Sequence, residues 1–316
     1  MSGEPSNLGR SVRAFHALKK WAFVAIPAIG ALELAAHVAQ THAVERDDDW
    51  FRARDYVASH AGPEDLVAFA PAWADPLGRR YFGRDIATVE REARPDETRF
   101  PRAFEVSLRG AHLSSVAQWR RQETTRFGGV TVTVLQNPDP VLVLEDLVSM
   151  VNPSRMRASR VDGSREVDCP FGHGAIESGG LGYGPAVGSS RFVCPGGGFV
   201  TESVVADLDY RPHRCIYAPP VGGMLRLRFI GVRFGRFLHG HHGLYVEAER
   251  GGSGAPVTIA FKVGDSNLGS VSHRDGDGWK PFELGTEALA GQRVDLIAEI
   301  ASNGDRRMYC FEADTR

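Results

Sequence analysis

The spacing of apolar and polar positions changes twice along the chain. Residues 21–40 form its longest apolar stretch. Between Asp47 and Pro138, short apolar runs alternate with runs of helical spacing. Beyond about Arg155, helical spacing nearly disappears and apolar residues alternate strictly with polar ones. Because a period near 3.6 marks a helix and a period of 2 marks a strand, the chain is predicted to have three successive parts.

The apolar stretch is predicted to cross a membrane, because a bilayer span takes about 20 predominantly apolar residues. Basic residues precede it and acidic residues follow it: Arg10, Arg13, Lys19 and Lys20 before, and Glu45, Asp47, Asp48 and Asp49 after. The positive-inside rule then places the N-terminus in the cytoplasm. We expect a cytoplasmic tail at 1–20, a transmembrane signal anchor at 21–42 in the cytoplasmic (inner) membrane, and a periplasmic remainder.

Two features of this stretch leave alternatives open. Glu33 and His37 lie four residues apart on one helix face. They contact a membrane-protein partner, or lie near the outer leaflet where water and headgroups reach them, or pair with each other. The segment Thr41-His42-Ala43 resembles a signal-peptidase site, although the apolar stretch is longer than a usual signal core. Whether the stretch is an uncleaved anchor or a cleaved signal peptide, the bulk of the chain is expected to be extracytoplasmic.

Residues 47–150 are predicted to form a small α/β domain. An acidic cluster opens a helix at 47–61, in which Trp50, Ala53 and Val57 share one face. Strands are expected at 65–70, 103–108 and 128–135, and helices at 112–122 and 141–151.

Residues 154–316 are predicted to form an antiparallel β-sandwich of the jelly-roll, galactose-binding-like kind. In the segment 224–229, Leu225, Leu227 and Phe229 alternate with Arg226 and Arg228. Further strands are expected at 201–210, 243–249, 257–263, 280–286, 293–300 and 307–313. A glycine-rich surface loop is expected at 172–190. The fold class is therefore α+β multidomain, with a single N-terminal transmembrane helix.

Composition and cysteine spacing narrow the compartment and the partners. A chain of 316 residues has room for two domains of about 150 residues. The net charge of −2 argues against a nucleic-acid partner. The four cysteines form no Cys-x-x-Cys pair, so a zinc ribbon or a thioredoxin-like site is not expected. Of the three pairings they allow, we favour the disulfides Cys169–Cys194 and Cys215–Cys310.

Two polar clusters invite a metal hypothesis. His239, His241 and His242 lie close in sequence, but adjacent residues of a strand point to opposite faces, so a polar hairpin is the simpler interpretation. Asp275 and Asp277 have the alternate spacing that calcium favours, although a turn before the next strand explains them as well. No cofactor is predicted.

Aromatic and charged residues give weak ligand-binding candidates. Tyr245 and Trp279, with Tyr210 and Tyr217, either stack on sugar rings or belong to the core. The segment 67–83 ends a strand in a Pro-rich corner whose Trp73, Asp75, Arg79 and Arg80 form either a ligand site or a rigid turn. No nucleophile elbow, Walker A loop or HExxH motif is present, which makes an enzyme the less favoured interpretation.

Three segments of the first domain carry a resemblance to a known family: DDWFRARDYVASHAGPEDLVAFAPAWADPLGRRYFG, FEVSLRGAHLSSVAQWR and RFGGVTVTVLQNP. They resemble the extracytoplasmic region that follows the membrane bundle in bacterial protein-mannosyltransferase-like glycosyltransferases. The later segments FVC, DYRPHRCIYAPP, GWKPFELGT and CFEADTR are similar to the jelly roll that accompanies it. The catalytic loops of those enzymes have no counterpart here, so the resemblance implies an ectodomain without its catalytic part.

These observations predict a single-pass accessory or binding protein of the cell envelope that recognises carbohydrate or a glycosyltransferase partner. Two alternatives remain: an enzyme acting on glycans or lipid-linked sugars, and a purely structural subunit of a membrane complex. The expected partners are the lipid bilayer, a carbohydrate ligand and a membrane protein.

Overall fold

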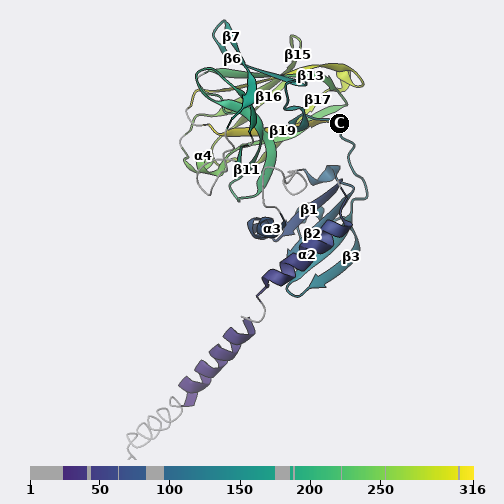
Figure 1. Ribbon diagram of the computed structural model, residues 1–316, viewed down its shortest axis with the longest axis vertical. Coiled ribbons are helices and arrows are strands. Elements are labelled where there is room, and N and C mark those ends of the chain that lie inside the picture. Colours follow the sequence, from purple (N-terminus) through teal and green to yellow (C-terminus); the bar gives the residue numbers. More distant parts are fainter. Residues whose placement is uncertain are drawn as a thin grey trace, which may run out of the picture.

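The structure is a computed structural model in which two units follow an N-terminal helix (Figure 1). It describes residues 24–40, 44–62, 64–82, 96–174, 186–187, 189–221, 223–252, 254–304 and 307–316. The first unit is a small α/β layer built on a four-stranded sheet, sheet A. The second is a β-sandwich built from a nine-stranded sheet, sheet B, and a six-stranded sheet, sheet C.

In the α/β unit, helix α2 (Asp47–His60) packs on sheet A, whose strand order is β1-β2-β4-β3. Strands β1 and β2 are parallel, and the other pairs are antiparallel. Trp50, Ala53 and Val57 of α2 are buried in one cluster with Phe69 and Phe104 of the sheet, as the apolar spacing predicts. The strands are β1 (Asp65–Ala70), β2 (Arg102–Leu108), β3 (Arg120–Phe127) and β4 (Val130–Gln136), with short helices α3 (Asp75–Phe82), η1 (Ala72–Ala74), η3 (Glu97–Arg99) and η4 (Ser114–Val116).

The helix predicted at 112–122 is wrong. Only the 3₁₀ turn η4 forms there, and Arg120 already begins the edge strand β3. Val116 and Trp119 do bury themselves, but in a cluster with Leu66 and Phe100 on the other side of sheet A. The apolar residues of this segment have helical spacing but form only a turn, because so short a segment is marginal as a helix.

The connecting helix predicted at 141–151 is also wrong. Strand β5 (Glu145–Asp146) pairs with the last strand, β19, and the 3₁₀ turn η5 (Val148–Met150) follows. Leu147, Val148 and Met150 join the core of the sandwich. This segment thus packs with the sandwich although it lies before residue 154.

Sheets B and C face each other across the largest apolar core of the described residues. Sheet B runs β17-β14-β19-β12-β11-β10-β8, with β5 on β19 and β9 on β11, and sheet C runs β16-β15-β18-β13-β6-β7. Leu227 and Phe229 of sheet C and Leu238 and Phe311 of sheet B meet in this core.

The strands of the sandwich match most of the predicted segments, and their bounds are as follows: β6 (Met156–Asp162), β7 (Arg165–Cys169), β8 (Phe171–His173), β9 (Ala186–Val187), β10 (Ser190–Val193), β11 (Phe199–Ala206), β12 (Pro212–Tyr217), β13 (Met224–Arg233), β14 (Phe237–Leu244), β15 (Val257–Val263), β16 (Ser266–His273), β17 (Lys280–Gly285), β18 (Arg293–Ser302) and β19 (Tyr309–Thr315). The strand expected at 243–249 is wrong, because β14 ends at Leu244 and helix α4 (Val246–Arg250) follows. Within the glycine-rich segment 172–190, residues 175–185 and 188 lie outside the described residues.

Both predicted disulfides are confirmed. Cys169–Cys194 joins the end of β7 to the residue after β10, with a Cα–Cα distance of 4.2 Å. Cys215–Cys310 joins the neighbouring strands β12 and β19, with a Cα–Cα distance of 5.8 Å. Since disulfides persist in oxidising compartments, this pairing agrees with an extracytoplasmic location.

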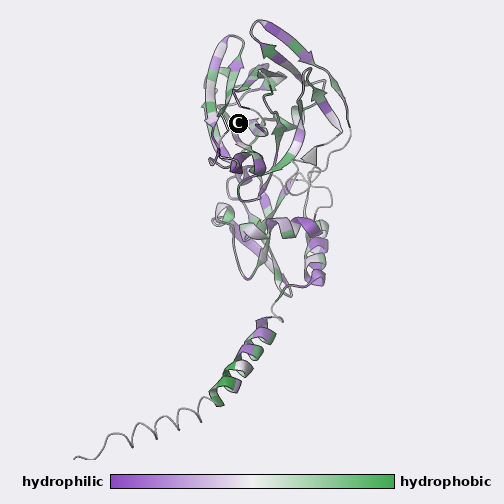
Figure 2. Ribbon diagram, turned by 90° about the vertical axis from the view of Figure 1, so that its left-hand side faces the viewer, coloured by the Kyte–Doolittle hydropathy of each residue, from purple (hydrophilic) through white to green (hydrophobic). Residues whose placement is uncertain are grey.

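The N-terminal helix covers residues 24–40, and its side chains are exposed, including those of Glu33 and His37. Figure 2 shows apolar residues over much of this helix, which stands apart from the two units. Within the described residues, no helix is both long and apolar enough to cross a bilayer. The predicted tail at 1–20, residues 21–23 of the predicted span and the segment Thr41–Ala43 lie outside the described residues.

Candidate functional site

The outer face of sheet C carries a groove of about 640 Å³. Alternation along the strands builds it. Leu225, Leu227 and Phe229 of β13 point into the core, so Arg226 and Arg228 between them point outward. The groove is lined by Arg157, Ser159, Glu166, Asp168, Arg226, Arg228, Lys262, Gly264, Asp265, Ile297 and Glu299.

The charged side chains of the groove hold one another in place. Arg226 donates to Glu299 at 2.8 Å and to Glu166 at 2.5 Å. Lys262 donates to Glu299 at 2.6 Å. Burial raises the pKa of Glu299, but the hydrogen bonds from Lys262 and Arg226 outweigh it and lower the pKa overall. Glu299 is therefore an ionised acceptor in the lining of the groove at neutral pH.

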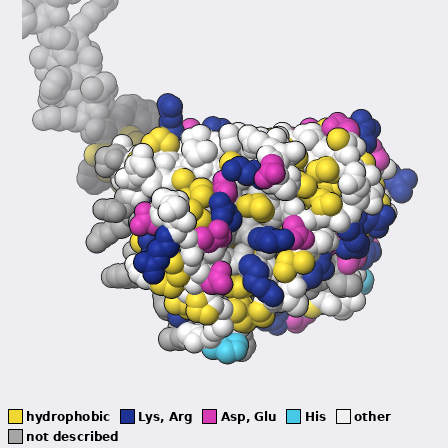
Figure 3. Space-filling view, turned by 90° about the horizontal axis from the view of Figure 1, so that it is seen from above, with side chains coloured by type: hydrophobic (Ala, Val, Ile, Leu, Met, Phe, Trp, Pro, Cys, Tyr) yellow, Lys and Arg dark blue, Asp and Glu magenta, His cyan; other side chains and the backbone are white. Residues whose placement is uncertain are grey.

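The groove has the volume of a small-molecule site, since such pockets span about 300–1,000 Å³. Its lining is charged, polar or glycine apart from Ile297. Figure 3, which views the molecule from above Figure 1, shows basic and acidic side chains interspersed over the face that it presents. Guanidinium and carboxylate groups offer several donors or acceptors in one plane, so they can hydrogen-bond neighbouring hydroxyl groups of one ligand.

The polar hairpin expected at the three histidines is wrong, because they lie within the single strand β14. Their side chains separate as strand geometry requires. His239 and His241 lie on one face, with ring centroids 5.3 Å apart. His241 Nδ1 lies 2.7 Å from Glu312 Oε1 on β19. His242 is buried on the opposite face, where its Nδ1 lies 3.0 Å from the Tyr309 hydroxyl and burial lowers its pKa to about 3. The structure therefore does not bring the three rings together around one point.

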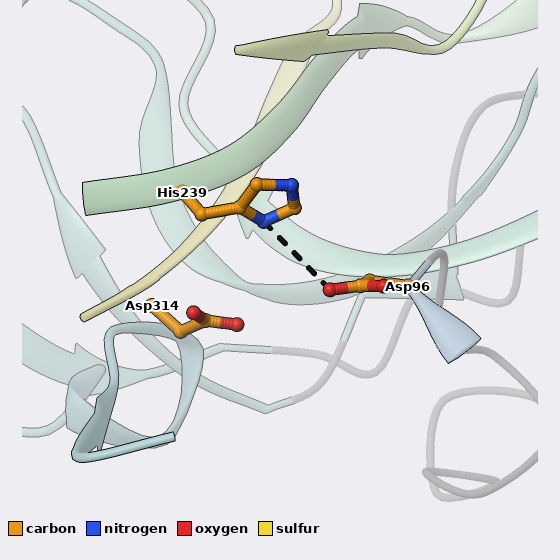
Figure 4. A group of neighbouring side chains, drawn as sticks. All are labelled: Asp96, His239 and Asp314. Atoms are coloured by element: carbon orange, nitrogen blue, oxygen red, sulfur yellow. Dashed lines mark ion pairs between the residues drawn. The ribbon is translucent and has the colours of Figure 1, made fainter. Parts of the chain in front are cut away.

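A cluster of possible metal ligands lies where the two units meet (Figure 4). Ligand atoms of Asp96, His239 and Asp314 lie within 4.8 Å of one another, and His239 Nδ1 is 3.7 Å from Asp96 Oδ2. Arg316 already pairs with both carboxylates, reaching Asp314 Oδ1 at 2.6 Å through Nε and contacting Asp96 through Nη2. Because a divalent cation would have to displace this guanidinium, the cluster does not fit a resident metal.

Asp275 and Asp277 each have a cationic partner of their own. Asp275 pairs with the buried Arg307 and also accepts from the backbone N–H of Gly254 at 2.7 Å. Asp277 pairs with Lys280 at 3.0 Å. The turn interpretation accounts for both residues, and their occupied oxygens do not favour calcium.

The Pro-rich corner forms a compact turn into helix α3. Asp75 Oδ2 accepts from Arg79 Nε at 2.9 Å, and the two side chains are only 14% and 7% exposed. Trp73 is 62% exposed, so it does not pack the corner. Arg80 is exposed and lies over the Tyr81 ring, 5.7 Å from its centroid.

The crevice beside this corner is small. It has a volume of about 30 Å³ and is lined by Asp75, Glu97, Arg211 and His213 among others. A water molecule needs roughly 10–15 Å³ of such space, so the crevice has room for water but not for a sugar ring. Burial raises the pKa of both Asp75 and Glu97. The structure thus favours the rigid-corner interpretation of Asp75 over a sugar-binding site.

The aromatic candidates belong to a packed cluster on the outer side of sheet B. Tyr245 is only 6% exposed and packs with Tyr217 and the Cys215–Cys310 disulfide, with Tyr210 and Trp279 against this cluster. Trp279 stacks on His213 with a centroid distance of 4.3 Å. The faces of these rings are occupied by protein, which leaves little of them for a sugar.

The residues of the groove were not among the sequence candidates. Their signal was the outward half of the alternation in 224–229, where two arginines stand between core residues. Arg157, Lys262 and Glu299 occupy the matching outward positions of β6, β15 and β18. The pairing of distant strands, which brings these side chains together, has no local sequence signal.

No family model and no curated protein sequence matches this chain. Among solved structures it is similar to CBM51-2 in complex with GlcNAc and INT domains from Clostridium perfringens ZmpB, at 8% identity and a TM-score of 0.31, covering 65% of this chain and 42% of that one. It is also similar to the M60 catalytic domain with CBM51-1 and CBM51-2 from the same protein, at 8% identity and a TM-score of 0.28, covering 63% and 20%. A third is the C-terminal CBM6 of LamC from Zobellia galactanivorans, at 13% identity and a TM-score of 0.21, covering 40% and 86%.

This chain therefore spans less than half the length of the first two structures. At these TM-scores the similarity carries no argument about function.

Proposed function

We propose that this chain is a membrane-anchored extracytoplasmic binding protein that recognises carbohydrate of the cell envelope through its sandwich, which we take to be a jelly roll. The groove on sheet C carries the proposal. It combines an accessible volume of about 640 Å³ with fixed, ionised donors and acceptors such as Arg226 and Glu299. Ile297 offers one apolar contact for the C–H face of a sugar ring.

The proposed anchor rests on the N-terminal segment. The described helix at 24–40 exposes large apolar side chains that no other part of the protein covers among the described residues: Val24, Ile26, Ile29, Leu32, Leu34 and Val38. A bilayer would remove this surface from water. The resemblance to glycosyltransferase ectodomains adds a second proposed partner, a polytopic transferase.

The binding proposal is tested with the full chain in detergent on an array of bacterial and plant polysaccharides. We expect retention of at least one class, and at least a tenfold weaker affinity for Arg226→Ala, because Arg226 bridges two acceptors of the groove. Arg233→Ala is the matched control, since Arg233 is an exposed arginine of the same strand that does not line the groove. No binding to any polysaccharide would refute the proposal.

The anchor is tested separately by fractionating cells that express the full chain. Retention of the intact chain in carbonate-washed membranes supports it. A soluble periplasmic form that begins at Val44 would instead establish a cleaved signal peptide and overturn the anchor.

A further inference from the structure

Two arginines stand directly opposite each other in the groove. Arg157 of β6 and Arg228 of β13 are cross-strand partners in the antiparallel pairing of the two strands. Both side chains are exposed and both line the groove. Like charges at directly opposed positions of an antiparallel pair repel each other, because their Cβ atoms lie only about 4.5–5.5 Å apart. Of the two, only Arg228 has a carboxylate partner among the described residues, Asp295.

The other cations of the groove are neutralised within the protein. Glu299 pairs with Arg226 and Lys262, and Asp295 pairs with Arg228 at 2.7 Å. Arg157 differs, because its hydrogen bonds go to the backbone carbonyls of Pro153 and Met156. Among the described residues, no carboxylate forms an ion pair with Arg157.

The strand register extends this pair into a row. Arg228 lies opposite Ile297 of β18, and Ile297 lies opposite Lys262 of β15. The row Arg157–Arg228–Ile297–Lys262 therefore crosses four adjacent strands, which at a strand spacing of about 4.8 Å gives a length of about 14 Å. A strip of this length, with cations at both ends and an apolar residue within it, suits an oligosaccharide rather than a single sugar.

We propose that the groove selects acidic saccharides, with an anionic group of the ligand bound between Arg157 and Arg228. This inference rests on the proposed carbohydrate function and names its ligand class. A carboxylate or sulfate there gives Arg157 the anionic partner that it lacks among the described residues and accepts hydrogen bonds from the guanidinium groups. The sugar ring that bears the anion then lies toward Ile297, which faces Arg228 on the neighbouring strand, and its C–H face contacts that side chain.

The test compares two probes that differ only in charge. Sodium oligogalacturonate and its methyl ester are titrated against the full chain in detergent at about 50 mM salt, where screening over these distances is incomplete. We expect the acidic form to bind at least tenfold tighter than the ester and to weaken as salt rises. Dextran sulfate against dextran forms the second arm, and a preference for the charged probe in either arm supports the inference and identifies the anion.

Variants connect this preference to the arginine pair. Arg157→Gln should remove most of the preference for the acidic probe while leaving the weak binding of the ester unchanged. Arg233→Gln should retain the full preference, because Arg233 lies on the same strand as Arg228 but outside the groove. Arg157→Gln should unfold at the same temperature as wild type or higher, since it removes one of two like charges at directly opposed positions of the strand pair.

The outcomes separate the two proposals. Equal binding of acidic and neutral probes overturns the inference and leaves the carbohydrate function standing. Binding of no saccharide at all overturns the function itself. A preference that Arg233→Gln reduces as much as Arg157→Gln reflects general attraction to the surface and also overturns the inference.

Discussion

At Asp75 two effects oppose each other, because burial disfavours the charged carboxylate while Arg79 favours it. Burial is the larger effect, and the pKa of Asp75 is raised overall. A folded-state pKa above the unfolded one means that the folded protein takes up this proton more readily. The contribution of Asp75 to stability is therefore greatest below the unfolded value of about 3.9 and is lost as the pH rises through the raised pKa.

The direction of this pH dependence of stability can be measured with Asp75→Asn. Urea unfolding of wild type and variant at pH 4 and pH 7.5 gives two differences in the free energy of unfolding, in which the other titrating groups largely cancel. We expect the advantage of wild type over the variant to be smaller at pH 7.5. An advantage that grows with pH would mean that the attraction of Arg79 outweighs burial. Arg80→Gln, on the exposed neighbour, should change stability by no more than about 0.5 kcal/mol at either pH.

Single residues could be foreseen from the sequence where one local rule decides their position. Strand alternation separates His242 from His241, and the structure confirms this. The same rule turns Arg226 outward. It could not show that Asp96 and Arg316 meet, since nothing local links an η3 flank to the end of β19. Nor could it show that Arg157 faces Arg228, because that depends on which strands pair and in which register.

At the scale of elements, the sequence predicts strands better than short helices. A strand with one buried face shows its period within six residues, as 257–263 and 293–300 do. Helix α3 was missed because Pro76 and Gly78 lie in its eight residues. Gly78 is needed there, since a Cβ at this position would lie 2.2 Å from the Phe69 ring. Strand β3 was missed because it is an edge strand with mostly exposed polar side chains, which show no apolar alternation.

The two disulfides join elements at different distances along the chain. Cys215–Cys310 spans 95 residues and Cys169–Cys194 spans 25. Loop-closure entropy predicts a loss of about 4–5 kcal/mol when the longer loop is opened and about 3–4 kcal/mol for the shorter one. In urea unfolding, the double variant Cys215→Ser/Cys310→Ser should therefore be the less stable of the two double-serine variants. The reverse order would show that native packing around Cys169–Cys194, rather than loop length, decides the difference.

At the scale of the whole molecule, ion pairs connect the α/β unit to the sandwich. Asp96 contacts Arg316, and Arg99 lies 3.7 Å from Asp146 and 3.9 Å from Asp314. Arg211 of the sandwich reaches Glu97 at 3.5 Å. These pairs are partly or largely buried, where charge interactions are screened less than at the surface. We infer that the two units unfold together.

Asp96 is the residue at which this coupling can be broken. Burial raises its pKa, but the ion pair with Arg316 and the hydrogen bonds from Thr98 outweigh burial and bring the pKa to about 2. A carboxyl whose pKa falls from about 3.9 to about 2 contributes roughly 2 kcal/mol of stability, present above pH 4 and lost as the pH falls through 2. Asp96→Asn should therefore destabilise the protein at pH 7, and the loss should shrink toward pH 2.

The tryptophans provide a probe for one unit. Trp50, Trp73 and Trp119 lie in the α/β unit and Trp279 lies in the sandwich. With Trp279 replaced by Phe in every protein compared, fluorescence follows mainly the unfolding of the α/β unit, whereas far-ultraviolet circular dichroism follows the many strands of the sandwich as well. In wild type at pH 7 the two signals should give one midpoint. In Asp96→Asn the fluorescence midpoint should come first, because the α/β unit loses its hold on the sandwich. The control is Asp139→Asn, on an exposed residue of the same unit, which should leave the midpoints together. If the two signals still coincide in Asp96→Asn at an unchanged midpoint, other contacts hold the units together and the ion pair does not.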